Sequence, residues 1–142
     1  MLGDGEMDNK LFSDFLKSGD SLRIYDGNKL VFSSTKDRLM PLLEYIDKNG
    51  CTNRGLTVFD KMTGNAAALL SIKIGCAEVG SPVGSESAVK TLKRYGIKYH
   101  LSEVIPVIIQ PDGKECPMER LSIGKEPEEF YLALIKMIKG NK

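Results

Sequence analysis

Residues 56–70, LTVFDKMTGNAAALL, pass from the pattern of a buried β-strand through a polar loop to an alanine-rich helix. The strand pattern covers residues 56–60, the loop covers 61–65, and the helix begins at 66–70. Open α/β sheets bind ligands where their strands end and the following helices begin. The segment therefore indicates an α/β fold and a candidate binding loop, but it does not name a reaction.

The sequence on either side extends this α/β pattern. Alternating apolar residues before and after an Asp-Gly turn predict a β-hairpin over residues 21–25 and 29–33. Hydrophobic spacing and capping residues predict helices at 8–16, at 37–49, at 85–95 and from Pro127 onward. Further strands are expected at 76–80 and 97–101, with a Gly/Ser/Pro loop at 81–85.

This order of elements predicts a single domain over residues 8–142, preceded by a flexible N-terminus at residues 1–7. A hairpin followed by alternating strands and helices is typical of a mixed β-sheet. We therefore expect a three-layer α/β fold in which helices cover both faces of that sheet.

The charge of the chain limits its partners. Its 142 residues include 20 basic and 19 acidic side chains, for a formal net charge of +1. No basic excess attracts nucleic acid or an anionic membrane. The apolar runs are shorter than the roughly 18 residues of a membrane helix, and the polar, acidic first residues are unlike a signal peptide. We expect a cytoplasmic protein without nucleic-acid or membrane partners.

The cysteines and the histidine argue against a metal site. Cys51, Cys76 and Cys116 are widely spaced, no CxxC motif occurs, and His100 is the one histidine. A zinc site needs three or four closely spaced nitrogen or sulfur ligands, and an odd number of scattered cysteines does not make a disulfide framework. We expect no metal and no cofactor, and we expect His100 on the surface because it alternates with apolar neighbours.

Three motifs carry a resemblance to a known family: TGNAAALL at residues 63–70, YGI at 95–97 and CPME at 116–119. Over residues 11–139 the chain resembles an uncharacterised prokaryotic domain-of-unknown-function family with a cytidine-deaminase-like fold. The resemblance implies that fold. Deaminases of this fold hold zinc with a His or Cys near a catalytic Glu at one helix start and a Pro-Cys-x-x-Cys at the next. This chain has SSTKD and TGNAA there, so the resemblance argues against zinc-dependent deamination.

The strand-to-helix loops supply candidate ligand-binding residues. A helix start presents free backbone N–H groups and a positive dipole end, which suits a phosphate or a carboxylate. A second such loop would reach the same edge of the sheet if its strand is a parallel neighbour. The leading hypothesis is therefore a pocket for a small anionic ligand or a nucleotide, formed by Asp60, Thr63, Gly64, Asn65, Ser81, Gly84 and Ser85. The simpler alternative is that Thr63 and Ser85 only cap their helices.

A different hypothesis rests on Cys116 and Glu119 as a candidate catalytic pair. Pro117 suits the first position of a helix and would make Cys116 its N-cap, where a thiolate forms more easily. Glu119 could serve as a base, so the alternative function is a thiol-dependent enzyme or redox sensor. Cys116 and Met118 could equally fill a core. A third interpretation is an oligomeric interaction or structural protein. Whether Cys116 and Gly64 share one site stays open.

Overall fold

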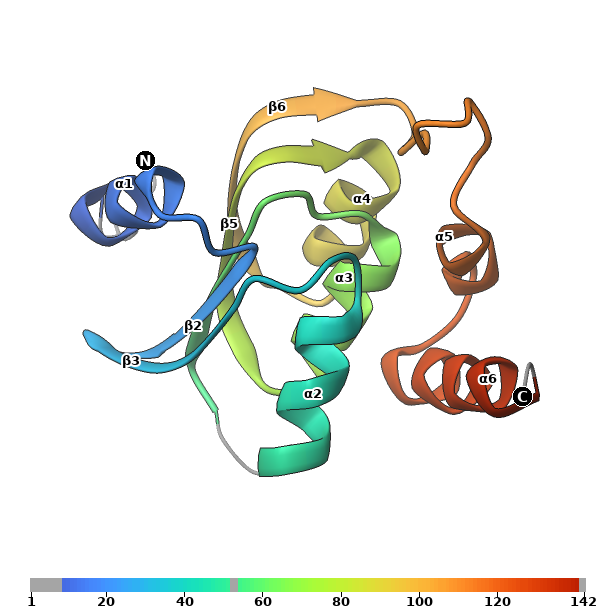
Figure 1. Cartoon of the computed structure of the whole chain (residues 1–142), viewed down its shortest axis with the longest axis horizontal. Helices are drawn as coiled ribbons and strands as arrows, with labels where there is room; N and C mark the ends of the chain where they lie inside the picture. Colours follow the sequence, from blue (N-terminus) through green and yellow to red (C-terminus); the bar gives the residue numbers. More distant parts are fainter. Residues whose placement is uncertain (1–8, 52–53, 141–142) are drawn as a thin grey trace.

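The computed structural model of the chain describes residues 9–51 and 54–140, so the flexible N-terminus expected at residues 1–7 lies outside the described residues (Figure 1). Its sheet has five strands in the order β3-β2-β4-β5-β6. Their bounds are Leu22–Asp26 (β2), Lys29–Ser34 (β3), Leu56–Asp60 (β4), Cys76–Ser85 (β5) and Lys98–Ile105 (β6). Strand β2 is antiparallel to β3 and β4, whereas β4, β5 and β6 are parallel. This confirms the mixed sheet.

Helices cover both faces of the sheet, as expected (Figure 1). Helix α1 lies on one face and α2, α3 and α4 lie on the other, while α5 and α6 pack on the outer side of α3. The expectation of three layers was therefore incomplete, because α5 and α6 add a further layer. The helix bounds are Asn9–Lys17 (α1), Met40–Asn49 (α2), Asn65–Lys73 (α3), Glu86–Arg94 (α4), Pro117–Ser122 (α5) and Pro127–Gly140 (α6).

Strand β4 is apolar because it is covered on both faces. Its Phe59 joins Phe12 and Phe15 in an aromatic cluster under α1, whereas Val58 belongs to the larger core beneath α3. Helix α3 is buried from Asn65 to Ser71, since the sheet and α6 enclose it. Its alanines allow the close packing that a helix enclosed in this way requires. The loop between β4 and α3 is therefore held by packed structure at both ends.

Local signals predicted several elements correctly. The hairpin forms at the Asp-Gly turn, and α6 begins at Pro127. Ser85 caps α4, because its Oγ accepts the backbone N–H of Ala88 at 3.1 Å. His100 is exposed and its ring meets Phe12 edge-on, with the ring centroids 5.5 Å apart. The expected surface position of His100 is thus confirmed.

Two expectations about boundaries were wrong. The predicted loop at 81–85 is strand, because β6 pairs with β5 along its length up to Ser85↔Ile105. Gly84 lacks a side chain for a packing reason, since a Cβ there would lie 2.5 Å from Cδ1 of Leu101. Helix α2 begins at Met40 instead of residue 37, because Arg38 has a φ of 59° that a right-handed helix does not allow.

Candidate functional site

A cavity of about 320 Å³ opens between the segment before α2, the end of β4, the start of α3 and α5. Its size falls at the lower end of the range for small-molecule sites, about 300 to 1,000 Å³. Asp60, Gly64, Cys116 and Glu119 line it. The cavity therefore brings the predicted binding loop and the predicted thiol–carboxylate pair into one site, which answers the question that the sequence left open.

The N-terminus of α3 is occupied by the carboxylate of Glu119. The backbone N–H of Asn65 donates to Oε2 at 2.9 Å, and the backbone N–H of Ala66 donates to Oε1 at 2.7 Å. Gly64 is the N-cap residue and permits this approach, because a Cβ there would lie 2.6 Å from Cδ of Glu119. The anion that the sequence led us to expect at this helix start is thus supplied by the protein itself.

Asn65 is buried in a hydrogen-bond network that holds α5 against α3 and α4. Its Nδ2 donates to the backbone oxygen of Ser122 at 3.1 Å and to Ser122 Oγ at 2.9 Å. Thr91 Oγ1 donates to Asn65 Oδ1. Asn65 is not among the residues that line the cavity, and its side chain acts between helices.

Asp60 is a buried carboxyl at the wall of the cavity, 9 % exposed. Burial raises its pKa to about 7, although the backbone N–H groups of Met62 and Lys61 pull the pKa down. Among the described residues no cationic side chain pairs with it. The Lys61 ammonium instead lies 5.0 Å from the centroid of the Phe15 ring and 3.4 Å from the backbone oxygen of Leu16. An ionisable group kept in a cavity without a charge partner marks a candidate functional site.

The candidate pair Cys116 and Glu119 lies at the start of α5. Cys116 is the N-cap residue before Pro117, as predicted, and its thiol makes no capping hydrogen bond. Burial raises the pKa of Glu119, against the effect of the N–H groups of Ala66 and Asn65. The cavity wall thus carries a partly buried thiol and two carboxyl groups with raised pKa values, those of Asp60 and Glu119.

The remaining predicted binding residues support the fold around the cavity and do not line it. Ser81 is buried, and its one hydroxyl hydrogen is shared between the backbone oxygens of Asp60 and Val83. Gly84 packs under Leu101, and Ser85 caps α4. Thr63 is not the helix cap, because Gly64 takes that position. Its Oγ1 is buried and finds no hydrogen-bond partner in the described part of the chain.

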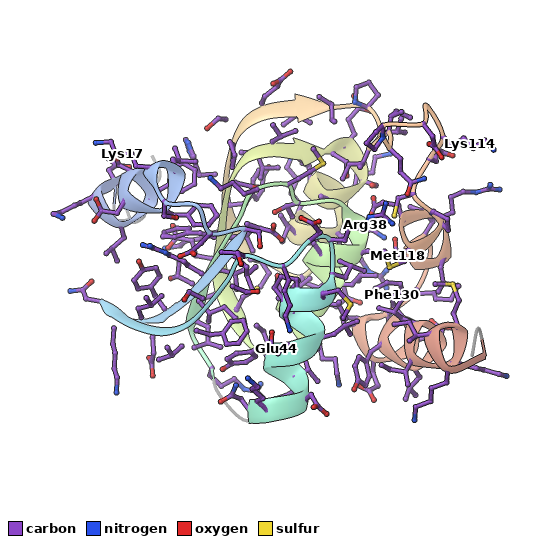
Figure 2. All side chains as sticks on the ribbon, viewed as in Figure 1. Lys17, Arg38, Glu44, Lys114, Met118 and Phe130 are labelled. Atoms are coloured by element: carbon purple, nitrogen blue, oxygen red, sulfur yellow. The ribbon has the colours of Figure 1, made fainter. Side chains whose placement is uncertain are left out.

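Sequence reasoning missed Arg38, which lines the cavity from the segment before α2. Figure 2 shows Arg38 on the side of α3 that faces Met118 of α5, and both side chains line the cavity. Arg38 is exposed and makes no ion pair with a described residue. Its positive φ of 59° is uncommon for a residue other than glycine, and such strain clusters at functional sites. Backbone strain leaves no signal in a single sequence.

Within residues 9–51 and 54–140, His, Cys, Asp and Glu side chains form no group of three or more that could hold a metal ion. No helix in the same residues has both the length and the apolar character needed to cross a membrane.

The fold and the cavity define an α/β protein with a mixed five-stranded sheet and a carboxyl-lined cavity at the start of its central helix. The chain belongs to the family described as Domain of unknown function (DUF1893), whose family model matches residues 11–138. It is also similar to the crystal structure of a DUF1893 family protein, TM1506, from Thermotoga maritima. The two are 29 % identical with a TM-score of 0.81, over 93 % of this chain and 92 % of the other. No curated protein matches the chain.

Proposed function

We propose that this protein binds one small, nucleotide-sized ligand in the cavity beside α3, on a zinc-free fold of the cytidine-deaminase-like type. The observation that carries the proposal is the Asp60 carboxyl, which is buried at the cavity wall without a cationic partner among the described residues. Burying an unpaired carboxyl costs stability. A ligand that hydrogen-bonds to this carboxyl gives a reason for keeping it there.

The other walls of the cavity suit the faces of a flat heterocycle. Ala66, Ala67, Ile108 and Met118 contribute apolar surface around the two carboxyl groups. Ligand sites of this kind combine mostly apolar walls with a few polar groups that fix orientation. At about 320 Å³, near the lower limit for small-molecule sites, the cavity suits a ligand no larger than one mononucleotide.

Arg38 is the residue that we assign to an anionic group on the ligand. The sequence had suggested the N-terminus of α3 for that purpose, but Glu119 already accepts its N–H groups. Arg38 stands exposed at the cavity and has no ion-pair partner among the described residues. Its guanidinium presents five N–H donors in a planar fork that matches phosphate and carboxylate oxygens.

The order of elements supports the cytidine-deaminase-like part of the proposal. An antiparallel hairpin leads into three parallel strands, with α3 and α4 as the crossover helices between them. The helix starts where deaminases carry zinc ligands are occupied here by residues 37–41, DRLMP, at the start of α2, and by residues 63–67, TGNAA, at the start of α3. Those side chains do not supply a zinc site, so we propose binding without zinc-dependent deamination.

A second candidate function is a thiol-dependent reaction or redox response at Cys116. The observation that favours it is the position of this thiol in the same cavity as Asp60 and Glu119. A ligand bound there would meet the thiol, and a carboxyl of raised pKa could accept or return its proton. The rate at which Cys116 is alkylated in the native protein tests this candidate.

Calorimetric titration with the four common ribonucleoside 5′-monophosphates, the corresponding nucleosides and inorganic phosphate tests the proposal. We expect at least one monophosphate to bind, and Arg38→Ala to weaken it to the level of its nucleoside. Lys17→Ala is the matched control, since Lys17 is an exposed cation of α1 on the other side of the sheet (Figure 2). If no nucleoside or monophosphate gives heat or a thermal shift, the proposal fails.

A further inference from the structure

The cavity offers one buried hydrogen-bond acceptor that the protein leaves partly unused. Both oxygens of Glu119 accept N–H groups of α3. Asp37 lines the cavity too, but it is exposed to solvent. Asp60 is therefore the buried carboxyl of this cavity that accepts no short hydrogen bond from a described residue, whereas Glu119 is held by two.

Asp60 has acceptor capacity to spare. An ionised carboxylate has about four lone-pair positions on its two oxygens. The Lys61 N–H lies near the carboxylate but donates to the backbone oxygen of Ser21 at 3.0 Å, and the Met62 N–H donates to Oδ1 across 3.4 Å, which is long for a hydrogen bond. Ser81 Oγ donates to the main-chain oxygen of Asp60, so it fixes the end of β4 without using the carboxylate. About half of the acceptor positions thus stay available on a side chain held in place by the sheet.

We propose that Asp60 selects ligands that carry two adjacent N–H donors on one edge, the arrangement found in the 2-amino-6-oxo edge of guanine and in free amidinium cations. The inference rests on the proposed function and names the ligand chemistry of that same cavity. Two parallel N–H···O bonds to one carboxylate are short, directional and stronger than neutral pairs. An edge that has a donor beside an acceptor, as in adenine, would direct its lone pair at the carboxylate.

The charges around Asp60 are consistent with this selection. Arg38, Asp37, Lys61, Cys116 and Glu119 are the other ionisable residues that line the cavity. The Lys61 ammonium lies against the Phe15 ring and the Leu16 backbone oxygen, and Glu119 is held by α3. None of these charged side chains pairs with the Asp60 carboxylate, so two N–H donors on a ligand would be its hydrogen-bonding partners. Ionisation of Asp60 strengthens such pairing, so affinity rises as the pH increases through about 7.

Calorimetric titration of the full chain with guanosine, inosine and adenosine 5′-monophosphates and with benzamidinium tests this selection. Inosine monophosphate is the matched control ligand, because it lacks only the 2-amino group. We expect the guanosine compound to bind about tenfold more tightly than the inosine compound, as one base-edge contact is worth. Asp60→Asn should abolish that difference, whereas Asp26→Asn, which changes an exposed carboxyl at the end of β2 outside the cavity lining, should leave it unchanged. Thermal melts confirm that each variant is folded.

The outcomes separate the two proposals. If guanosine and inosine monophosphates bind equally in the cavity and Asp60→Asn changes neither, the selection by Asp60 is overturned while the proposed function stands. If benzamidinium alone binds and its binding needs Asp60, the selection by Asp60 stands. The ligand is then a free amidinium cation, and the proposed anionic ligand is excluded. If nothing binds, both proposals fall. If Asp60→Asn does not fold, the unchanged chain provides the test. Selection by Asp60 then requires that the preference for guanosine over inosine monophosphate increase from pH 6 to pH 8, and a preference that does not increase overturns it.

Discussion

Glu119 caps helix α3 at Ala66, 53 positions earlier in the chain, through an N–H···Oε1 hydrogen bond of 2.7 Å. Helix caps usually come from residues next to the helix. Here the cap comes from α5, so one carboxylate satisfies the start of the central helix and fixes α5 over the cavity. The position of α5, and with it the position of Cys116, depends on this contact.

Removing the cap should destabilise the protein. Glu119→Ala leaves the buried N–H groups of Asn65 and Ala66 without an acceptor, and we expect a loss of about 1–3 kcal/mol in the free energy of unfolding. Glu119→Gln keeps one oxygen acceptor and should cost less. Urea denaturation followed by circular dichroism measures both. Glu115→Ala, which removes an exposed carboxylate of the same segment, is the control and should stay within about 0.5 kcal/mol.

The contact between Glu119 and the start of α3 should require a glycine at position 64. A Cβ there would lie 2.5 Å from Cδ1 of Ile108 and 2.6 Å from Cδ of Glu119, so Gly64→Ala must displace both side chains or shift the backbone. Such overpacking costs about 1–3 kcal/mol. Gly19→Ala is the matched control, because a Cβ at Gly19 meets nothing within 4 Å. Thermal melts of both variants measure the effect, and equal melting temperatures would contradict the crowding at Gly64.

Sequence signals succeeded where the structure depends on neighbouring residues. The Asp-Gly turn predicted the hairpin, and Ser85 predicted the start of α4, since each feature forms within a few residues. The loop expected at 81–85 failed because Gly, Ser and Pro are local turn signals, whereas β6 makes this segment a strand through tertiary pairing. Local composition does not report which strands will meet.

The candidate site was predicted in part. Asp60, Gly64, Cys116 and Glu119 all line the cavity, although the sequence assigned them to two separate hypotheses. Their proximity follows from the packing of α5 on α3, which no local pattern encodes. Helix α3 was expected to offer free N–H groups, but the distant Glu119 accepts them.

The buried Asp60 carboxyl should make stability depend on pH. Its pKa is about 7 in the folded protein against an ordinary value of 3.8, so the folded state binds more protons between these values. The contribution of Asp60 to stability therefore falls as the pH rises from about 4 to about 7 and then stays level. At 1.36 kcal/mol per unit of pKa, the loss approaches about 4 kcal/mol.

Asp60→Asn tests this dependence, because the amide has nearly the same shape and no charge. We expect the variant to be more stable than the unchanged chain at pH 8, by about 2–4 kcal/mol, and nearly equal to it at pH 4. Urea denaturation at both values measures the difference. A variant that is less stable at pH 8 would show that the carboxylate is stabilised by a group other than the N–H groups of Lys61 and Met62.

The three cysteines should differ in their reaction with iodoacetamide. Cys76 is buried in β5, and burial raises its pKa to about 12, so we expect no modification in the native protein. Cys116 is partly exposed and lines the cavity, so it should react, and a nucleotide bound beside α3 should slow the reaction. Peptide mapping by mass spectrometry measures each rate. Cys51, partly exposed but not part of the cavity lining, is the internal control whose rate the nucleotide should not change. If the nucleotide slows Cys51 and Cys116 equally, it acts on the reagent or on global opening of the protein, and not at the cavity. If Cys116 reacts at pH 6 no faster than free cysteine, the case for a thiol-dependent activity fails.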